Sequence, residues 1–165
     1  MENPNIFRAT QDPFIDDPRE DFDAAVTVVS AGYPTVYCVP LTSYDVEDGP
    51  TRAYLNARNN GHGSETALKA ANRYSRVFGD GTPVTLTHAT GYTQSDWWDI
   101  LATGPEAEAA VDMFAMFLRG DVYDVTEYEV KTCDLGHEHE EQVDSLFGIY
   151  ADSENDAIAT YKESR

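Results

Sequence analysis

Positive charge is what this sequence has least of. The 165 residues include three lysines, Lys69, Lys131 and Lys162, and 11 basic residues in all, against 30 acidic ones, so the formal net charge is −19. Proteins that bind nucleic acid or anionic membranes directly use cations to displace counterions. The charge balance therefore argues against both kinds of ligand and favours a basic groove on another protein as the partner.

Cysteine and long apolar runs are also scarce. Cys38 and Cys133 are the two cysteines, and because they follow no recognised spacing we expect a reduced pair in an intracellular protein. The first residues lack the basic and apolar regions of a signal peptide. No apolar run reaches the roughly 18 residues that a membrane span needs. These absences predict a cytoplasmic protein with no membrane partner.

Catalytic signatures are missing as well. The sequence contains no GxSxG, no HExxH, no set of kinase motifs and no calcium-binding loop. Carboxylates can always act as general acids and bases, but in so acidic a chain their presence says little about chemistry. We therefore expect a protein that is not an enzyme and that has no cofactor.

Most of the chain has the composition of a folded domain, with 41% hydrophobic residues. Residues 1–24 differ, because they hold three prolines and seven acids and show no periodicity. We expect these residues to form an acidic, partly ordered arm. Residues 25–165 are expected to form a single α+β domain.

Periodicity predicts about three helices and several β-hairpins within that domain. Apolar residues recur at helical spacing over 64–78 and 104–120, and a last helix is expected to begin near Ser153. Residues 25–41 suggest a hairpin, and strands are expected over 84–89, 96–103, 122–133 and 142–151. The order ββ-α-ββ-α-ββ-α favours an antiparallel sheet of hairpins with the helices on one side.

Charge is distributed unevenly along the chain. Residues 49–95 carry five bases and two acids, whereas residues 96–165 carry four bases and 18 acids, a net charge of −14. Lys69, Arg73 and Arg76 lie on one side of the helix predicted from residue 64. This basic face predicts a homo-oligomer in which it contacts an acidic surface of another copy.

The stretch CDLGHEHEEQVDS, residues 133–145, has two interpretations. On a strand, His137 and His139 point to the same side, Cys133 or Glu141 offers a third zinc ligand, and Cys38 offers a fourth. However, the stretch is charged, contains Gly136 and lies between two β-rich runs, as a hairpin loop does. A solvated loop is the main interpretation, and a metal-stabilised protein remains the alternative.

The acids of the C-terminal half lie on adjacent predicted elements. DNA presents dense negative charge, and a protein surface with carboxylates at comparable density can bind the same grooves with fast, steered association. The acids expected to contact such a partner are Asp121, Asp124, Glu127, Glu129, Asp134, Glu138, Glu140, Glu141 and Asp144. Solubility or adaptation to high salt would produce the same composition.

Two adjacent tryptophans add an apolar element to this surface. On a strand, Trp97 and Trp98 point to opposite sides, so one is expected in the core and the other in contact with something else. An exposed tryptophan beside an acid is typical of a protein-contact hot spot. We expect one of the two to anchor the partner.

Three motifs carry a resemblance to other proteins. They are GYTQSDW at 91–97, RGDVY at 119–123 and DSLFGIY at 144–150. In their order and spacing, residues 70–150 resemble a diffuse set of small uncharacterised proteins encoded by actinobacterial phages and plasmids. The resemblance implies a mobile-element setting, in which small acidic proteins often inhibit host defence, as antirestriction and anti-CRISPR proteins do. It assigns no functional residues.

Charge and resemblance together predict an inhibitor of a host DNA- or RNA-binding defence protein, a nuclease or a CRISPR effector. The inhibitor would present a DNA-mimicking surface in the host cytoplasm. The alternatives are the metal-stabilised protein that uses Cys133, His137 and His139, and an acidic accessory interaction module without mimicry.

Overall fold

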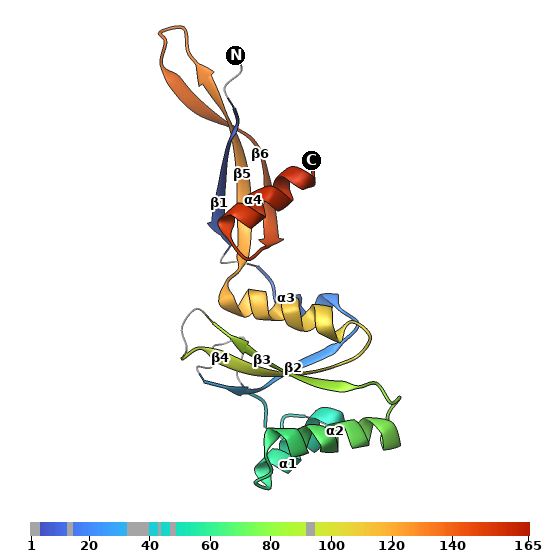
Figure 1. The fold of residues 1–165 in the computed structure, drawn as a ribbon. Helices are drawn as coiled ribbons and strands as arrows, with labels where there is room; N and C mark the ends of the chain where they lie inside the picture. Colours follow the sequence, from blue (N-terminus) through green and yellow to red (C-terminus); the bar gives the residue numbers. More distant parts are fainter. Residues whose placement is uncertain (1–3, 13–14, 33–39, 43, 47–48, 92–94) are drawn as a thin grey trace. The chain divides into compact units, whose positions relative to one another are not determined.

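A computed structural model of the chain describes residues 4–12, 15–32, 40–42, 44–46, 49–91 and 95–165 (Figure 1). The strands in these ranges are β1 (Ile6–Gln11), β2 (Ala25–Ala31), β3 (Val84–Thr90), β4 (Trp97–Thr103), β5 (Val122–Thr132) and β6 (Glu138–Tyr150). The helices are the 3₁₀ helix η1 (Pro18–Asp21) and the α-helices α1 (Pro50–Asn59), α2 (Ser64–Phe78), α3 (Ala107–Arg119) and α4 (Glu154–Glu163). The predicted α+β class is confirmed.

The predicted arrangement is wrong in two respects. The described residues form two three-stranded antiparallel sheets rather than one sheet, and they contain four α-helices rather than three. Helix α1 has no counterpart among the predicted helices. Its buried residues are Tyr54 and Leu55, a stripe too narrow to show a helical period in the sequence.

The chain divides into two compact units. Unit 2, Asp17–Arg119, is inserted in the sequence between the two segments of unit 1, Met1–Asp16 and Gly120–Arg165. This division differs from the expected arm at 1–24 and domain at 25–165. The reason is that β1, near the start of the chain, pairs with β5, far along it, and no local pattern reveals such a pairing.

Unit 2 is a sheet with helices on both faces. Its strand order is β2-β4-β3. Helices α1 and α2 pack on one face against a core that includes Val29, Val84 and Leu101. Helix α3 contacts all three strands on the other face (Figure 1), towards which the buried Ile100 points because neighbouring strand residues alternate. Coverage on both faces explains why β4 is a nearly continuous apolar run.

Unit 1 is a sheet with the strand order β1-β5-β6 and helix α4 packed against it (Figure 1). Helix α4 begins next to Ser153, its N-cap, close to the predicted start. Phe7 and Ala9 of β1 pack against the core that Val125 and Tyr161 help to form. Phe7 and Ala9 alternate with polar residues, so one side of β1 faces the core. Strand β1 is therefore an edge strand of the sheet, although its segment was expected to be a partly ordered arm.

The remaining strand predictions have mixed outcomes. Strands β3, β4 and β5 form where the sequence predicts them, whereas β6 begins at Glu138, four residues before its predicted start. Strand β2 also forms, but it pairs with β4. The second half of the hairpin expected over 25–41 falls on residues 33–39, which lie outside the described residues.

Candidate functional site

The β5–β6 hairpin continues past the end of its neighbouring strand. Strand β1 pairs with β5 from Tyr123 to Tyr128, and beyond this point β6 is the one strand among the described residues that pairs with β5 (Figure 1). We call residues 129–141 the acidic tip. All of its side chains are exposed except that of Val130, which is half-buried. The tip carries one base, Lys131, and the acids Glu129, Asp134, Glu138, Glu140 and Glu141.

Two exposed bases contact acids of the tip. The guanidinium of Arg8 donates to both carboxylate oxygens of Glu140, at 2.5 and 2.7 Å, and Lys131 pairs with Glu141 and, at 3.6 Å, with Glu129. These hydrogen bonds hold the pKa of Glu140 and that of Glu141 below their usual values. Exposed ion pairs contribute little stability, so a more strongly cationic partner can replace them.

The other acids of the tip are more available. Asp134 and Glu138 have no ion-pair partner within the described ranges. At about 3.4 Å per residue, Glu138, Glu140 and Glu141 place three carboxylates within about 10 Å of strand. One strand of DNA carries about one phosphate per 3.4 Å of helix axis. The carboxylates of the tip are therefore spaced like the phosphates of one strand of DNA, with Glu140 and Glu141 paired to Arg8 and Lys131.

The turn at the end of the tip closes on itself through its backbone. The N–H of Cys133 donates to the carbonyl of His137 at 2.9 Å, and the N–H of Gly136 donates to the carbonyl of Cys133 at 2.8 Å. Gly136 has φ +80°, a left-handed conformation that glycine adopts readily. The predicted hairpin connection is therefore present, but it is shorter than expected and spans residues 133–137, because residues 138–141 of the expected loop belong to β6.

The structure does not bring together the residues of the alternative metal site. No three His, Cys, Asp or Glu side chains in the described part of the chain are grouped to hold a metal ion, so Cys133, His137 and His139 do not form such a set. Backbone hydrogen bonds from Leu135 and His137 lower the pKa of the exposed Cys133 thiol. Cys38, the fourth ligand considered, lies outside the described residues.

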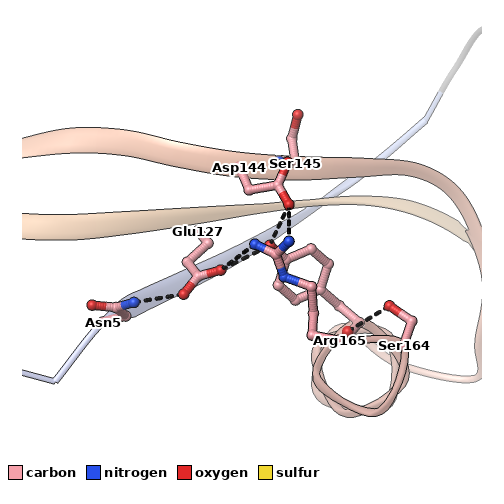
Figure 2. Close-up of polar contacts among 7 residues, drawn as sticks. Asn5, Glu127, Asp144, Ser145, Ser164 and Arg165 are labelled. Carbon is pink, nitrogen blue, oxygen red and sulfur yellow. Dashed lines mark hydrogen bonds and ion pairs between the residues drawn. The ribbon is translucent and has the colours of Figure 1, made fainter.

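Glu127 and Asp144 lie in a polar cluster at the end of α4 (Figure 2). Glu127 accepts hydrogen bonds from Asn5 at 2.5 Å and from the Tyr161 hydroxyl at 2.8 Å. Arg165 pairs with Glu127 at 3.3 Å and also with Asp144. Both acids were predicted to contact a partner, but these contacts give them a role in attaching α4 to the sheet.

Replacement of Glu127 by glutamine is expected to make the stability of unit 1 depend less on pH in the acidic range. Hydrogen bonds from Asn5 and Tyr161 hold the pKa of Glu127 below the ordinary value of a glutamate. A lowered folded-state pKa contributes stability that is present above the unfolded pKa and is lost as the pH falls through the folded one.

Urea titrations followed by circular dichroism measure this effect. The wild-type protein should be more stable than the Glu127→Gln variant at neutral pH, and this difference should disappear at a pH below the folded pKa of Glu127. An equal difference at both pH values would show that the carboxylate charge is not its source.

Asp121 and Asp124 are also poorly placed for a partner. Asp121 is 4% exposed, and burial, followed by the charge of Asp152, raises its pKa. Asp124 is half-buried and accepts a hydrogen bond from the N–H of Gly148 at 3.1 Å, and burial raises its pKa as well. The structure thus corrects the surface role predicted for these two acids, because strand β5 enters the core at this end.

The two tryptophans differ as the alternation of a strand requires. Trp98 is 3% exposed, so it is the tryptophan expected in the core, and only Trp97 is left as a candidate surface anchor. Trp97 is half-buried and stacks on His88, with ring centroids 5.5 Å apart. A Cβ at Gly32 would lie 2.0 Å from Nε1 of Trp97, so a side chain at position 32 would displace the indole.

Sequence reasoning missed a histidine–aspartate pair beside Trp97. Nδ1 of His88 lies 2.6 Å from Oδ1 of Asp99, and the two residues face each other on β3 and β4. Both strands were predicted, so the pair could have been found by aligning them. Residues 92–94 of the connection between these strands lie outside the described residues.

The predicted basic face is on the surface of α2. Lys69 and Arg73 line a groove between α1 and α2, and Arg76 lies outside that lining. All three side chains are exposed. Lys69 pairs with Glu65 at 3.3 Å, one helical turn away.

Comparisons of this chain with family models, with curated proteins and with solved structures find no match in any of the three. Among the described residues, no helix is long and apolar enough to cross a membrane.

Proposed function

We propose that the protein inhibits a nucleic-acid-handling defence protein of its host, a nuclease or a CRISPR effector, by inserting the acidic tip into the groove that binds DNA. The observation that carries the proposal is the exposure of the tip together with its density of carboxylates. In this proposal the protein is encoded by a mobile element and acts in the host cytoplasm.

The contact residues are the five acids of the tip, Glu129, Asp134, Glu138, Glu140 and Glu141. Asp134 and Glu138 are the first to engage, because no ion pair within the described ranges has to break. Arginines and lysines of the target then compete with Arg8 and Lys131 for the remaining acids. Binding of this kind is fast at low salt and weakens as salt screens the charges.

Unit 1 supports the tip through buried and paired acids. Glu127 and Asp144 attach α4 to the sheet, so the strands that carry the tip are held by contacts the target does not touch. Trp97 belongs to unit 2 and serves as an additional apolar contact only if the target also reaches that unit.

The double variant Asp134→Asn/Glu138→Gln is expected to lose inhibition by about tenfold or more, because charge pairs across an interface determine steering and affinity. The double variant Glu108→Gln/Asp112→Asn is the matched control. It neutralises one glutamate and one aspartate that are equally exposed, on α3.

The measurement has two parts. Phage plating is counted on an actinobacterial host with an active restriction or CRISPR system, with and without the expressed protein, and DNA cleavage by the purified nuclease of that system is followed in parallel. Wild type and control should raise plating and slow cleavage. If all three proteins have no effect, the function is wrong for that system. If all three inhibit equally, inhibition does not use a DNA-mimicking tip.

A further inference from the structure

The outer side of the α1–α2 pair carries an apolar groove with a cationic border. The groove has a volume of about 510 Å³ and is lined by Ala53, Ala70, Tyr74, Val77 and Phe78 together with Thr66, Lys69 and Arg73. Val77 is 60% exposed and Phe78 is 75% exposed, although they are large apolar residues at the end of a helix. Exposed apolar surface with a polar border is typical of a protein-contact site.

The residues of the groove are arranged to receive a side chain. The rings of Tyr74 and Phe78 lie 5.1 Å apart and tilted by 43°, and Ala70, one turn before Tyr74, leaves space beside them. Lys69 and Arg73 are one turn apart on the same helix, so their charges border one side of the groove. The groove therefore fits an apolar side chain with acids next to it.

The acidic tip of this chain has that chemistry. Leu135, at the turn of the hairpin, is 82% exposed and has Asp134 beside it and Glu138 at the start of β6. The closed turn of residues 133–137 fixes the backbone on both sides of Leu135, so little conformational entropy is lost when it binds. Its apolar side chain matches the groove, and its acids match Lys69 and Arg73.

We propose that the groove binds the acidic tip of a second copy of this chain, with Leu135 between Tyr74, Val77 and Phe78, and Asp134 and Glu138 next to Lys69 and Arg73. Reciprocal exchange of the tips gives a dimer with two identical contacts, which together bind more tightly than either alone. The proposal does not depend on the proposed inhibition, because the purified protein alone tests it.

Sedimentation equilibrium of the full chain measures the dimer. We expect dimers at low salt, where the Debye length is about 30 Å at 0.01 M, and monomers near 1 M, where it is about 3 Å. The variant Arg73→Glu should weaken dimerisation by about tenfold or more, since it places like charges together. Arg76→Glu is the matched control, because it makes the same charge change on the same helix outside the groove.

A mixing experiment identifies the two partner surfaces. Arg73→Glu has a damaged groove and an intact tip, whereas Leu135→Asp has a damaged tip and an intact groove. Each variant alone should be monomeric, and an equimolar mixture should form a heterodimer through one intact contact. Wild type that stays monomeric at low salt overturns the proposal, as does a dimer that survives Arg73→Glu or a mixture that fails to associate.

Discussion

Replacement of Tyr161 by alanine is expected to unfold unit 1 under conditions in which unit 2 stays folded. Tyr161 is 1% exposed and lies in the core of unit 1, with its ring 6.0 Å from that of Phe7. Truncation of a buried aromatic side chain to alanine costs about 3–5 kcal/mol. Whole domains are stable by only about 5–15 kcal/mol, so this loss is a large share of the stability expected for unit 1.

The hydroxyl of Tyr161 adds to the expected loss. It donates to Glu127 at 2.8 Å, and burial together with this bond raises the pKa of Tyr161 to about 12. Without the hydroxyl, Glu127 keeps Asn5 and Arg165 as partners. The control Tyr161→Phe keeps the ring and removes only the hydrogen bonds of the hydroxyl, to Glu127 and, at 3.5 Å, to Asp144, so its effect should be much smaller.

The two units can be followed separately in one sample. Trp97 and Trp98 are the two tryptophans of the chain, and both belong to unit 2. Tryptophan fluorescence therefore reports unit 2, whereas far-ultraviolet circular dichroism reports both units. Tyr161→Ala should give an early transition by circular dichroism and leave the fluorescence midpoint unchanged. Equal shifts of both signals would mean that the units unfold as one.

Replacement of Phe114 by alanine is expected to destabilise unit 2, whereas Tyr161→Ala destabilises unit 1. Phe114 is 0% exposed on α3, its ring is stacked 6.1 Å from that of Phe117, and the guanidinium of Arg19 lies 4.3 Å from its centroid. The truncation should destabilise unit 2 by about 3–5 kcal/mol. The fluorescence midpoint should therefore fall strongly in urea titrations.

Met116→Ala is the control for Phe114→Ala on the same helix. Met116 is half-buried, so its truncation creates a smaller cavity and should move the fluorescence midpoint much less. If Phe114→Ala left the midpoint at the wild-type value, α3 would not be part of the structure that the tryptophans report.

Local patterns predicted the elements whose own sequence contains the signal. Helix α3 has a wide apolar stripe, with Ala110, Val111 and Phe114 buried, and Ser153 accepts from the N–H of Asp156 as a helix N-cap does. Helix α1 buries only two positions, and β1 is short and polar on alternate residues. Both need a distant partner to be stable, so neither could be predicted from its own residues.

The candidate site shows the same division. Charge predicted that the C-terminal half is strongly acidic, but it could not separate the acids by role. Glu127 and Glu129 are two residues apart on β5, yet Glu127 bonds to Tyr161 and Glu129 lies on the exposed tip. The roles of Glu127 and Glu129 differ because of the position of α4 over the strand. The sequence of the strand does not show where a helix packs on it.

The sequence by itself determined the α+β class, the strongly negative charge and the presence of a hairpin connection between β5 and β6, because composition and short-range periodicity depend on neighbouring residues. The tertiary structure alone decided which sheet each strand joins, and it separated the buried Asp121 and Trp98 from the exposed Asp134 and Glu138. The physical reason is that strand pairing and burial depend on contacts between residues far apart in the chain. Such contacts also brought Arg8 to Glu140 and Tyr161 to Glu127.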